Sequence, residues 1–277
     1  MKFKKFSMFT LIAAFAVLAF STAAMAQVTV TPSNAAAEGW VPFTRAGGTI
    51  SWVVDPTAPG GEALRLTTAN DGNSKALFID RTVIPFSEVT ELSYWTKQVS
   101  APFPGANASY QLQVCLGGFN SPQTPTNPTG CTGFTTLVFE PYQHNGLNPS
   151  TQAVIPGQWQ QWDVDAGMFW SSGTYSNGAC SVQAGFGGTY FYNLSDLQAA
   201  CPGAMTVGYG VNIGGGNPGW DVYTDLVSFN GVVTDFELYA NDKEQCKNGG
   251  WQVFMRPPSN TPFKNQGDCI QFMNTGK

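Results

Sequence analysis

The sequence contains a single histidine, His144, and no C-x-x-C pair, so it lacks the ligand sets of common zinc sites. The G-x-S-x-G motif is absent, as are the E-x-D-x-E and E-x-D-x-x-E strand signatures of sandwich glucanases. Gly214–Gly216 is followed by no lysine and no helical pattern, which excludes a phosphate-binding P-loop. Asp163 and Asp165 place two acids on one strand face, a pattern more typical of a solvated face or a cation site than of catalysis. We therefore predict that the protein is not an enzyme.

Charge is scarce, and positive charge is the scarcer sign. Only 11% of the residues are charged, with 13 Lys and Arg against 18 Asp and Glu. Residues 1–26 have the features of a secretory signal peptide: early lysines, an apolar run over Met8–Phe20, and the small-x-small cleavage site Ala24–Ala26. Cleavage before Gln27 removes three lysines and leaves ten basic against eighteen acidic side chains, a formal charge of −8. We expect a secreted protein, extracellular or periplasmic, that binds no nucleic acid and does not insert into a membrane.

The six cysteines all lie after the predicted cleavage site, and an even number in an oxidising compartment predicts disulfides. Six cysteines allow 15 connectivities. We predict sequential pairing, because each such pair closes a loop that is rich in Gly, Pro or Asn and has no core of its own. Each closure contributes about 3 kcal/mol in the chain-entropy model. The predicted bonds are Cys115–Cys131, Cys180–Cys201 and Cys246–Cys269.

After Gln27, short apolar and β-branched runs alternate with Gly, Pro and Asn, and helical periodicity is nearly absent. This pattern predicts an antiparallel β-sandwich or jelly roll over residues 27–239, with one helical turn over Asn193–Cys201. Residues 240–277 form a polar linker and a cysteine-bracketed segment that is too short to bury a core alone. The predicted strands are Val28–Thr31, Thr49–Val54, Ala63–Thr68, Lys75–Phe78, Val89–Val99, Ser109–Leu116, Thr135–Glu140, Trp159–Val164, Met205–Ile213 and a hairpin over Trp220–Tyr239. The predicted loops are 120–132, 143–156 and 167–192.

The hairpin is specified by Asn230-Gly231, because both central residues of a type I′ turn need a positive φ. A two-residue turn fixes which residues of the two strands face each other, and this register puts Asp225 on an apolar face. A carboxylate there needs a hydrogen bond, an ion pair or a metal. The opposite face, which includes Asp235 and Glu237, is predicted to be the wetter side. The predicted facing pairs are Phe229 with Val232, Val227 with Thr234, Asp225 with Phe236, and Tyr223 with Leu238.

Two stretches resemble known families. The hairpin T-D-L-V-S-F-N-G-V-V-T-D-F-E resembles the last strands of secreted bacterial jelly-roll or concanavalin-like sandwiches. The tail, C-K-N-G-G-W followed by F-K-N-Q-G-x-C-I-x-F, resembles a cysteine-bracketed terminal motif found on many secreted bacterial proteins of unassigned function. The first resemblance implies a fold, and the second identifies a family motif that implies no activity.

The hairpin resemblance also implies a cofactor. In jelly-roll carbohydrate-binding modules, an acid at the position of Asp225 helps to bind a structural calcium together with an acid from an early strand. Glu38 holds a comparable place here, and loop carbonyl oxygens would complete the six to eight ligands that calcium takes. The alternative is that Asp225 lies at the sheet edge and accepts backbone N–H bonds.

Strand alternation predicts aromatic and amide side chains on polar sheet faces. It places Trp95 on the same side as Ser93 and Lys97, and it turns Trp159 and Gln161 to one side of their strand. Gln111 and Gln113 likewise turn away from their apolar neighbours. Indole rings stack on the apolar faces of sugars, and amides supply paired donors and acceptors, so these five residues are candidate ligand-binding residues. The alternative for both tryptophans is core or edge packing.

We expect a non-catalytic, lectin-like protein that binds a glycan or cell-surface polysaccharide at a cell envelope or in a matrix. The alternative from another class is a structural or adhesive surface protein, whose edge strands pair with copies of itself or with a protein partner. A glycosidase would need two close carboxyl groups in one cleft.

Overall fold

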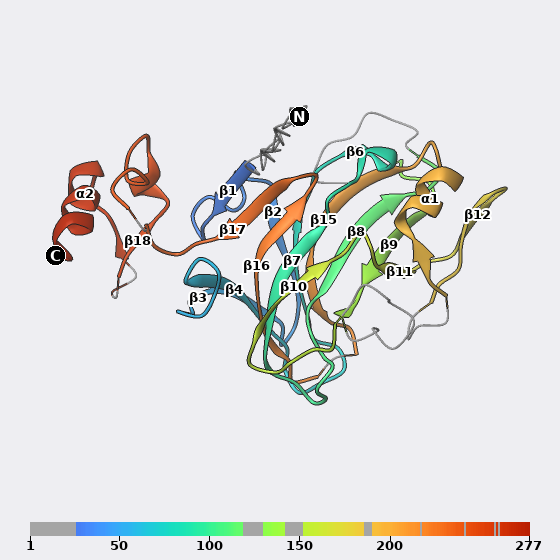
Figure 1. The fold of residues 1–277 in the computed structure, drawn as a ribbon, viewed down its shortest axis with the longest axis horizontal. Helices are drawn as coiled ribbons and strands as arrows, with labels where there is room; N and C mark the ends of the chain where they lie inside the picture. Colours follow the sequence, from blue (N-terminus) through green and yellow to red (C-terminus); the bar gives the residue numbers. More distant parts are fainter. Residues whose placement is uncertain are drawn as a thin grey trace, which may run out of the picture.

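The structure is a computed structural model that describes residues 26–118, 130–141, 152–185, 190–216, 218–240, 242–257, 259 and 261–277. Within these residues, two mainly antiparallel sheets pack face to face (Figure 1). The predicted β-sandwich with disulfide-clipped loops and a small C-terminal appendage is confirmed. No helix in this part of the chain is long and apolar enough to span a bilayer.

The elements follow one another in chain order with these bounds: β1 Ala26–Val30, β2 Trp40–Arg45, β3 Thr49–Val54, β4 Glu62–Thr67, β5 Lys75–Asp80, β6 Ile84–Pro85, η1 Phe86–Glu88, β7 Ser93–Ser100, β8 Ser109–Cys115, β9 Phe134–Phe139, β10 Trp159–Asp163, β11 Met168–Ser171, β12 Tyr175–Asn177, β13 Cys180–Val182, β14 Tyr192–Asn193, α1 Leu194–Ala200, β15 Met205–Gly214, β16 Asp221–Phe229, β17 Val232–Phe236, η3 Gly250–Gln252, β18 Met255–Arg256, β19 Thr261–Pro262 and α2 Gln266–Thr275.

Sheet A, as we call it, is centred on β16, which pairs with β7 along one side and with β4 and then β17 along the other. β10 extends this sheet beyond β7, β3 lies beyond β4, and β1 runs parallel to β17. Sheet B runs in the order β14, β11, β9, β8, β15, β5, β2, with β6 beside the start of β15. The core between the sheets is rich in aromatic rings: Trp40 meets Tyr209 and Phe236 edge-on, at centroid distances of 5.5 and 5.1 Å.

The Asn230-Gly231 turn forms as predicted, with φ of 53° and 73°. Phe229 pairs with Val232 and Val227 with Thr234, also as predicted. The regular ladder ends at Leu226, which has a φ of 46° and interrupts the pairing with β7. Leu226 therefore forms a β-bulge inside the longest strand of sheet A.

The bulge reverses which side chains face the core, because one extra residue shifts the two-residue alternation of a strand by one. Val222 and Val227 both belong to the core, whereas Tyr223 and Asp225 lie on the outer side of sheet A. The prediction that Tyr223 and Asp225 share a core face with Phe229 is wrong. Tyr223 does not pair with Leu238; it pairs with Arg65 and Lys97. Asp225 is no ladder partner of Phe236, and its side chain accepts that residue's backbone N–H.

The prediction that one face of the hairpin is wetter is also wrong. Asp235 is only 7% exposed and Glu237 only 1%, because the segment before β4 and strand β1 lie against them. Sequence alternation describes the two sides of a strand but contains no information on what packs over the second side.

Every strand predicted outside the hairpin is present within a few residues of its expected bounds, and α1 confirms the predicted helical turn. β2 was not predicted; it is the edge strand of sheet B, where Pro42 removes no hydrogen bond that a neighbour needs. The predicted loop 167–192 contains the short strands β11, β12 and β13. Helix α2 was also not predicted.

The disulfides join the cysteines in the predicted sequential order. The Cα atoms are 5.4 Å apart in Cys115–Cys131, 4.8 Å in Cys180–Cys201 and 5.8 Å in Cys246–Cys269. The structure has no free cysteine.

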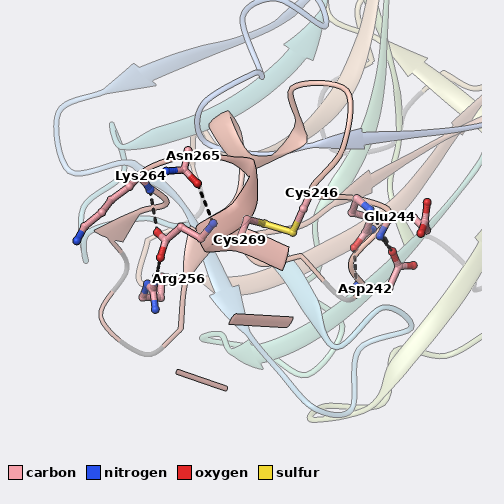
Figure 2. The surroundings of a disulfide bond; sticks show 9 residues. Asp242, Glu244, Cys246, Arg256, Lys264, Asn265 and Cys269 are labelled. Carbon is pink, nitrogen blue, oxygen red and sulfur yellow. Dashed lines mark hydrogen bonds and ion pairs between the residues drawn. A yellow bond between two sulfur atoms is a disulfide. The ribbon is translucent and has the colours of Figure 1, made fainter. Parts of the chain in front are cut away.

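The C-terminal segment has a small core of its own. Cys246, Phe254, Phe263 and Cys269 are buried in a cluster separate from that of the sandwich. Figure 2 shows the Cys246–Cys269 bond, which ties the stretch after Asp242 to helix α2. In Figure 1 this segment lies to one side of the sandwich, beyond β17. Met255 links the segment to the end of the sandwich: its backbone N–H donates to Leu238 O, and it forms a β-bridge with Tyr239.

Two groups of predictions lie outside the described residues. The signal-peptide prediction falls on residues 1–26, of which only Ala26 is described. Most of the predicted loops 120–132 and 143–156, including His144, also lies outside.

Candidate ligand-binding surface

The outer side of sheet A carries a group of aromatic and polar side chains. In the β7–β10 ladder, Gln161 lies directly opposite Trp95, and Trp159 lies opposite Lys97. Directly opposed residues in an antiparallel pair point to the same side of the sheet, so these four side chains share one face. Tyr223, opposite Lys97 on β16, belongs to the same face. We call Trp95, Lys97, Trp159, Gln161 and Tyr223 the aromatic face.

The alternation that predicted this face is confirmed by burial. Tyr94 and Trp162, the neighbours that point the other way, are 0% and 1% exposed. Trp95, Trp159 and Tyr223 are partly exposed and Gln161 is exposed. The two tryptophans are therefore not core residues.

Asp55 fixes part of the aromatic face from the segment between β3 and β4. Its Oδ2 accepts a hydrogen bond from Lys97 Nζ at 2.7 Å and from the Trp159 indole N–H at 3.1 Å, while Oδ1 accepts from Thr57. Burial by itself would raise the pKa of Asp55, but these hydrogen bonds lower it to about 2. The carboxylate is thus ionised at any physiological pH, and it holds the Trp159 ring in place.

Basic and acidic side chains continue the face across the sheet. Arg65 lies opposite Tyr223 and makes a two-pronged ion pair with Asp221, at 2.9 and 2.7 Å. Trp159, Lys97, Tyr223 and Arg65 form a transverse row over β10, β7, β16 and β4. At the usual spacing between strands, this row is about 14 Å long. The arrangement offers rings for stacking and charged or amide groups for hydrogen bonds to an elongated polar ligand.

Gln111 and Gln113 do not join the aromatic face. Both lie on β8 in sheet B, on the side away from the core, because Tyr110 and Leu112 point inward. They are only 6% and 8% exposed, and Gln113 Oε1 accepts a hydrogen bond from Arg81 at 2.5 Å. The structure therefore divides the five predicted ligand-binding residues between the two sheets.

Four carboxyl groups form a cluster beside the aromatic face. Glu62, Asp225, Asp235 and Glu237 are all at most 7% exposed. We call them the carboxyl cluster. Asp225 accepts the N–H of Phe236 at 3.0 Å. Gln27 donates to Asp235, and the backbone N–H groups of Leu238 and Tyr239 donate to Glu62.

Burial and the neighbouring carboxylates shift pKa values within this cluster upward. Burial, together with the nearby Asp235 and Glu62, raises the pKa of Glu237 to about 10. Burial and the charge of Asp235 also raise the pKa of Asp225 well above its ordinary value. At neutral pH Glu237 is therefore protonated. Gly60 lies so close that a Cβ atom on it would be 2.4 Å from Glu237 Oε1, so the Asp55–Gly61 segment packs onto the cluster.

The structure does not bring together the acids of the expected calcium site. Glu38 is exposed and lies beside Asp80 in a separate pocket, whereas the groups that act on Asp225 are Asp235 and the backbone. Within the described residues, no three His, Cys, Asp or Glu side chains are arranged to hold a metal ion. The alternative interpretation of Asp225 is correct in part: its side chain accepts a backbone N–H, but from the middle of sheet A and not from its edge.

Sequence reasoning missed Asp55, Asp80 and the carboxyl cluster. Asp55 had one local signal, the following Pro56-Thr57, since an Asp often accepts hydrogen bonds from the residue two positions on. Asp80 had the same local signal in Thr82. The carboxyl cluster is brought together by strand pairing, and of its four members the sequence singled out Asp225 alone.

No family model and no curated protein sequence matches the chain. Among solved structures, it is similar to a family 11 carbohydrate-binding module of the cellulosomal cellulase Lic26A-Cel5E of Clostridium thermocellum, with 9% identity over 72% of this chain and 89% of that one (TM-score 0.34). An arabinose-bound MgGH51 α-L-arabinofuranosidase aligns with 11% identity over 72% of this chain and 24% of its own (TM-score 0.34). A Bauhinia forficata lectin in complex with GalNAc aligns with 13% identity over 67% of this chain and 98% of its own (TM-score 0.20). Similarity at this level says nothing about what this chain binds.

Proposed function

We propose that the protein is a secreted, non-catalytic glycan-binding protein and that an extended polysaccharide lies along the aromatic face. The observation that carries this proposal is the diagonal placement of Trp95 and Trp159 on one face, with Gln161 directly opposite Trp95 and Lys97 directly opposite Trp159. Rings of this kind stack on the apolar side of a pyranose, while amide and ammonium groups bind its hydroxyls.

Preorganisation supports the same proposal. The hydrogen bond from Trp159 to Asp55, and the ion pair of Lys97 with the same carboxylate, order two ligand-facing side chains in the free protein. Ordering such groups in advance removes part of the entropic cost of binding.

The test is a glycan array and a pull-down on insoluble polysaccharides with the chain from Gln27 onward, in calcium and in chelator. Trp95→Ala and Trp159→Ala are compared with Trp251→Ala, a partly exposed tryptophan of the C-terminal segment. We expect the first two variants to weaken binding by about tenfold, since a stacked ring contributes about 0.5–1.5 kcal/mol beyond the area it buries. Trp251→Ala should bind as the unmodified protein does. A protein that binds no glycan, or whose binding is indifferent to both face variants, would refute the proposal.

A second candidate function is self-association through sheet edges. β2 and β3 are edge strands of the two sheets, and they carry the exposed side chains Phe43 and Val54, 49% and 51% accessible. Unpaired edges with apolar side chains invite pairing with another chain. Sedimentation over a range of concentrations separates the candidates: Val54→Lys should abolish any association that uses this edge and leave glycan binding unchanged.

A further inference from the structure

A pocket opens between the two sheets beside the Asn230-Gly231 turn, away from the aromatic face. It has a volume of about 260 Å³. Trp40, Tyr209, Phe229 and Val232 form its apolar walls, and its polar lining consists of Glu38, Asp80, Thr82, Asn230 and Thr234. We call it the Glu38–Asp80 pocket.

Asp80 offers one free oxygen in this pocket although the residue is 91% buried. Its Oδ1 accepts both the backbone N–H and the hydroxyl of Thr82, at 2.7 and 2.5 Å. Within the described residues nothing donates to Oδ2, which faces the turn at Gly39. Oδ2 is therefore available to accept a hydrogen bond from a molecule in the pocket.

Glu38 adds a second negative charge without a counter-ion. It lies close enough to Asp80 to raise the pKa of that carboxyl group further, in addition to the effect of burial. None of the ion pairs in the described part of the chain involves either residue. The pocket thus combines two uncompensated acids with aromatic walls.

We propose that the Glu38–Asp80 pocket binds an organic ammonium ion, a primary amine carried on a compact carbon body. The amine donates to Asp80 Oδ2 and to the Glu38 carboxylate, and the carbon body packs against Trp40, Phe229 and Val232. Charge-assisted hydrogen bonds of this kind are roughly twice as strong as neutral ones, and the apolar walls strengthen them.

Two other cations fit the pocket less well. A calcium ion takes six to eight oxygen ligands, whereas half of the ten residues that line this pocket are aromatic or aliphatic and two are carboxylates. A guanidinium group binds best to both oxygens of one carboxylate, and at Asp80 one of the two is already occupied by Thr82. A single ammonium group that bridges two carboxylates matches the free acceptors.

The experiment is ligand-observed saturation-transfer NMR with the chain from Gln27 onward. n-Butylammonium is compared with n-butanol, which has the same carbon body without the charge, and glucosamine with glucose. Glu38→Gln and Asp80→Asn each remove a charge and keep an acceptor oxygen, so the fold is retained. Glu244→Gln removes an exposed charge in the C-terminal segment and is the matched control.

We expect n-butylammonium and glucosamine to bind and their neutral counterparts to bind at least about tenfold more weakly. Each pocket variant should weaken ammonium binding by about tenfold, and the double variant should abolish it, while Glu244→Gln has no effect. Equal binding of butylammonium and butanol would overturn the proposal, because the pocket would then be an apolar cavity only. Failure of both ammonium probes to bind, or displacement of them by calcium at a one-to-one ratio, would overturn it as well.

Discussion

The indole N–H of Trp159 donates to Oδ2 of Asp55 at 3.1 Å, so a residue between β3 and β4 fixes a ring on β10, four strands away across sheet A. The same oxygen holds Lys97 at 2.7 Å. One carboxylate therefore sets the position of two members of the aromatic face.

Asp55→Asn should weaken glycan binding and lower the free energy of unfolding by about 1–3 kcal/mol at neutral pH, because the ion pair with Lys97 is lost in a mostly buried place. The pKa of Asp55 is about 2 in the folded protein against an ordinary 3.8. A lowered pKa contributes stability above pH 4 that disappears as the pH falls towards 2. Urea unfolding between pH 2 and 7 measures this, with Glu244→Gln as control. Parallel curves for Asp55→Asn and the unmodified protein would contradict the prediction.

Glu237→Gln tests the carboxyl cluster in the opposite pH direction. The folded-state pKa of Glu237 is about 10, above its ordinary 4.5, so the group favours the folded state below pH 4.5 and progressively loses this contribution as the pH rises towards 10. We expect the unmodified protein to lose stability between pH 5 and 9 and Glu237→Gln to lose less. Thermal unfolding over that range measures the slope. A slope that the variant leaves unchanged would show that Glu237 does not titrate in this way.

At position 226, asparagine should be more favourable than valine, the reverse of their usual order in β-strands. At a φ of 46°, Leu226→Asn is tolerated, whereas Leu226→Val places a β-branched side chain in a left-handed conformation. We expect the valine variant to be less stable than the asparagine variant by about 1 kcal/mol, although valine is the better strand former. Chemical denaturation of both proteins gives the comparison. Greater stability of the valine variant would mean that position 226 is not a bulge in solution.

Cys246→Ser with Cys269→Ser should unfold the C-terminal segment and leave the sandwich intact. The disulfide closes a separation of 23 residues around a core separate from that of the sandwich, and its loss costs about 3 kcal/mol. Brief proteolysis followed by mass spectrometry should remove residues after Tyr239 from the variant only. Glycan binding should be retained by the trimmed protein; its loss would place part of the binding surface in the C-terminal segment.

Local sequence signals were sufficient for most of the long strands, the turn and the sequential disulfides. Asn230-Gly231 specified its own backbone conformation, and alternation correctly turned Trp95 and Trp159 away from the core. These features depend on neighbours in sequence, which is why they were predictable.

The errors arose where distant segments decide. A leucine at positive φ has no sequence signature, so the bulge at Leu226 and the outward turn of Tyr223 and Asp225 could not be predicted. Strand order across the sheets, which separates Gln111 and Gln113 from the tryptophans, is set by pairing between residues far apart in the chain. The Glu38–Asp80 pocket likewise forms between segments that local patterns do not connect.

The parallel pairing of β1 with β17 has a consequence for the order of folding. Val28 meets Thr234, a partner more than 200 positions further along the chain. A contact between residues so far apart in sequence closes a long loop, which has a large entropic cost and forms slowly. β1 therefore has no partner strand until nearly the whole sandwich has been synthesised. The Gln27–Asp235 hydrogen bond can form only at that final closure, which makes the carboxyl cluster one of the last parts of the molecule to assemble.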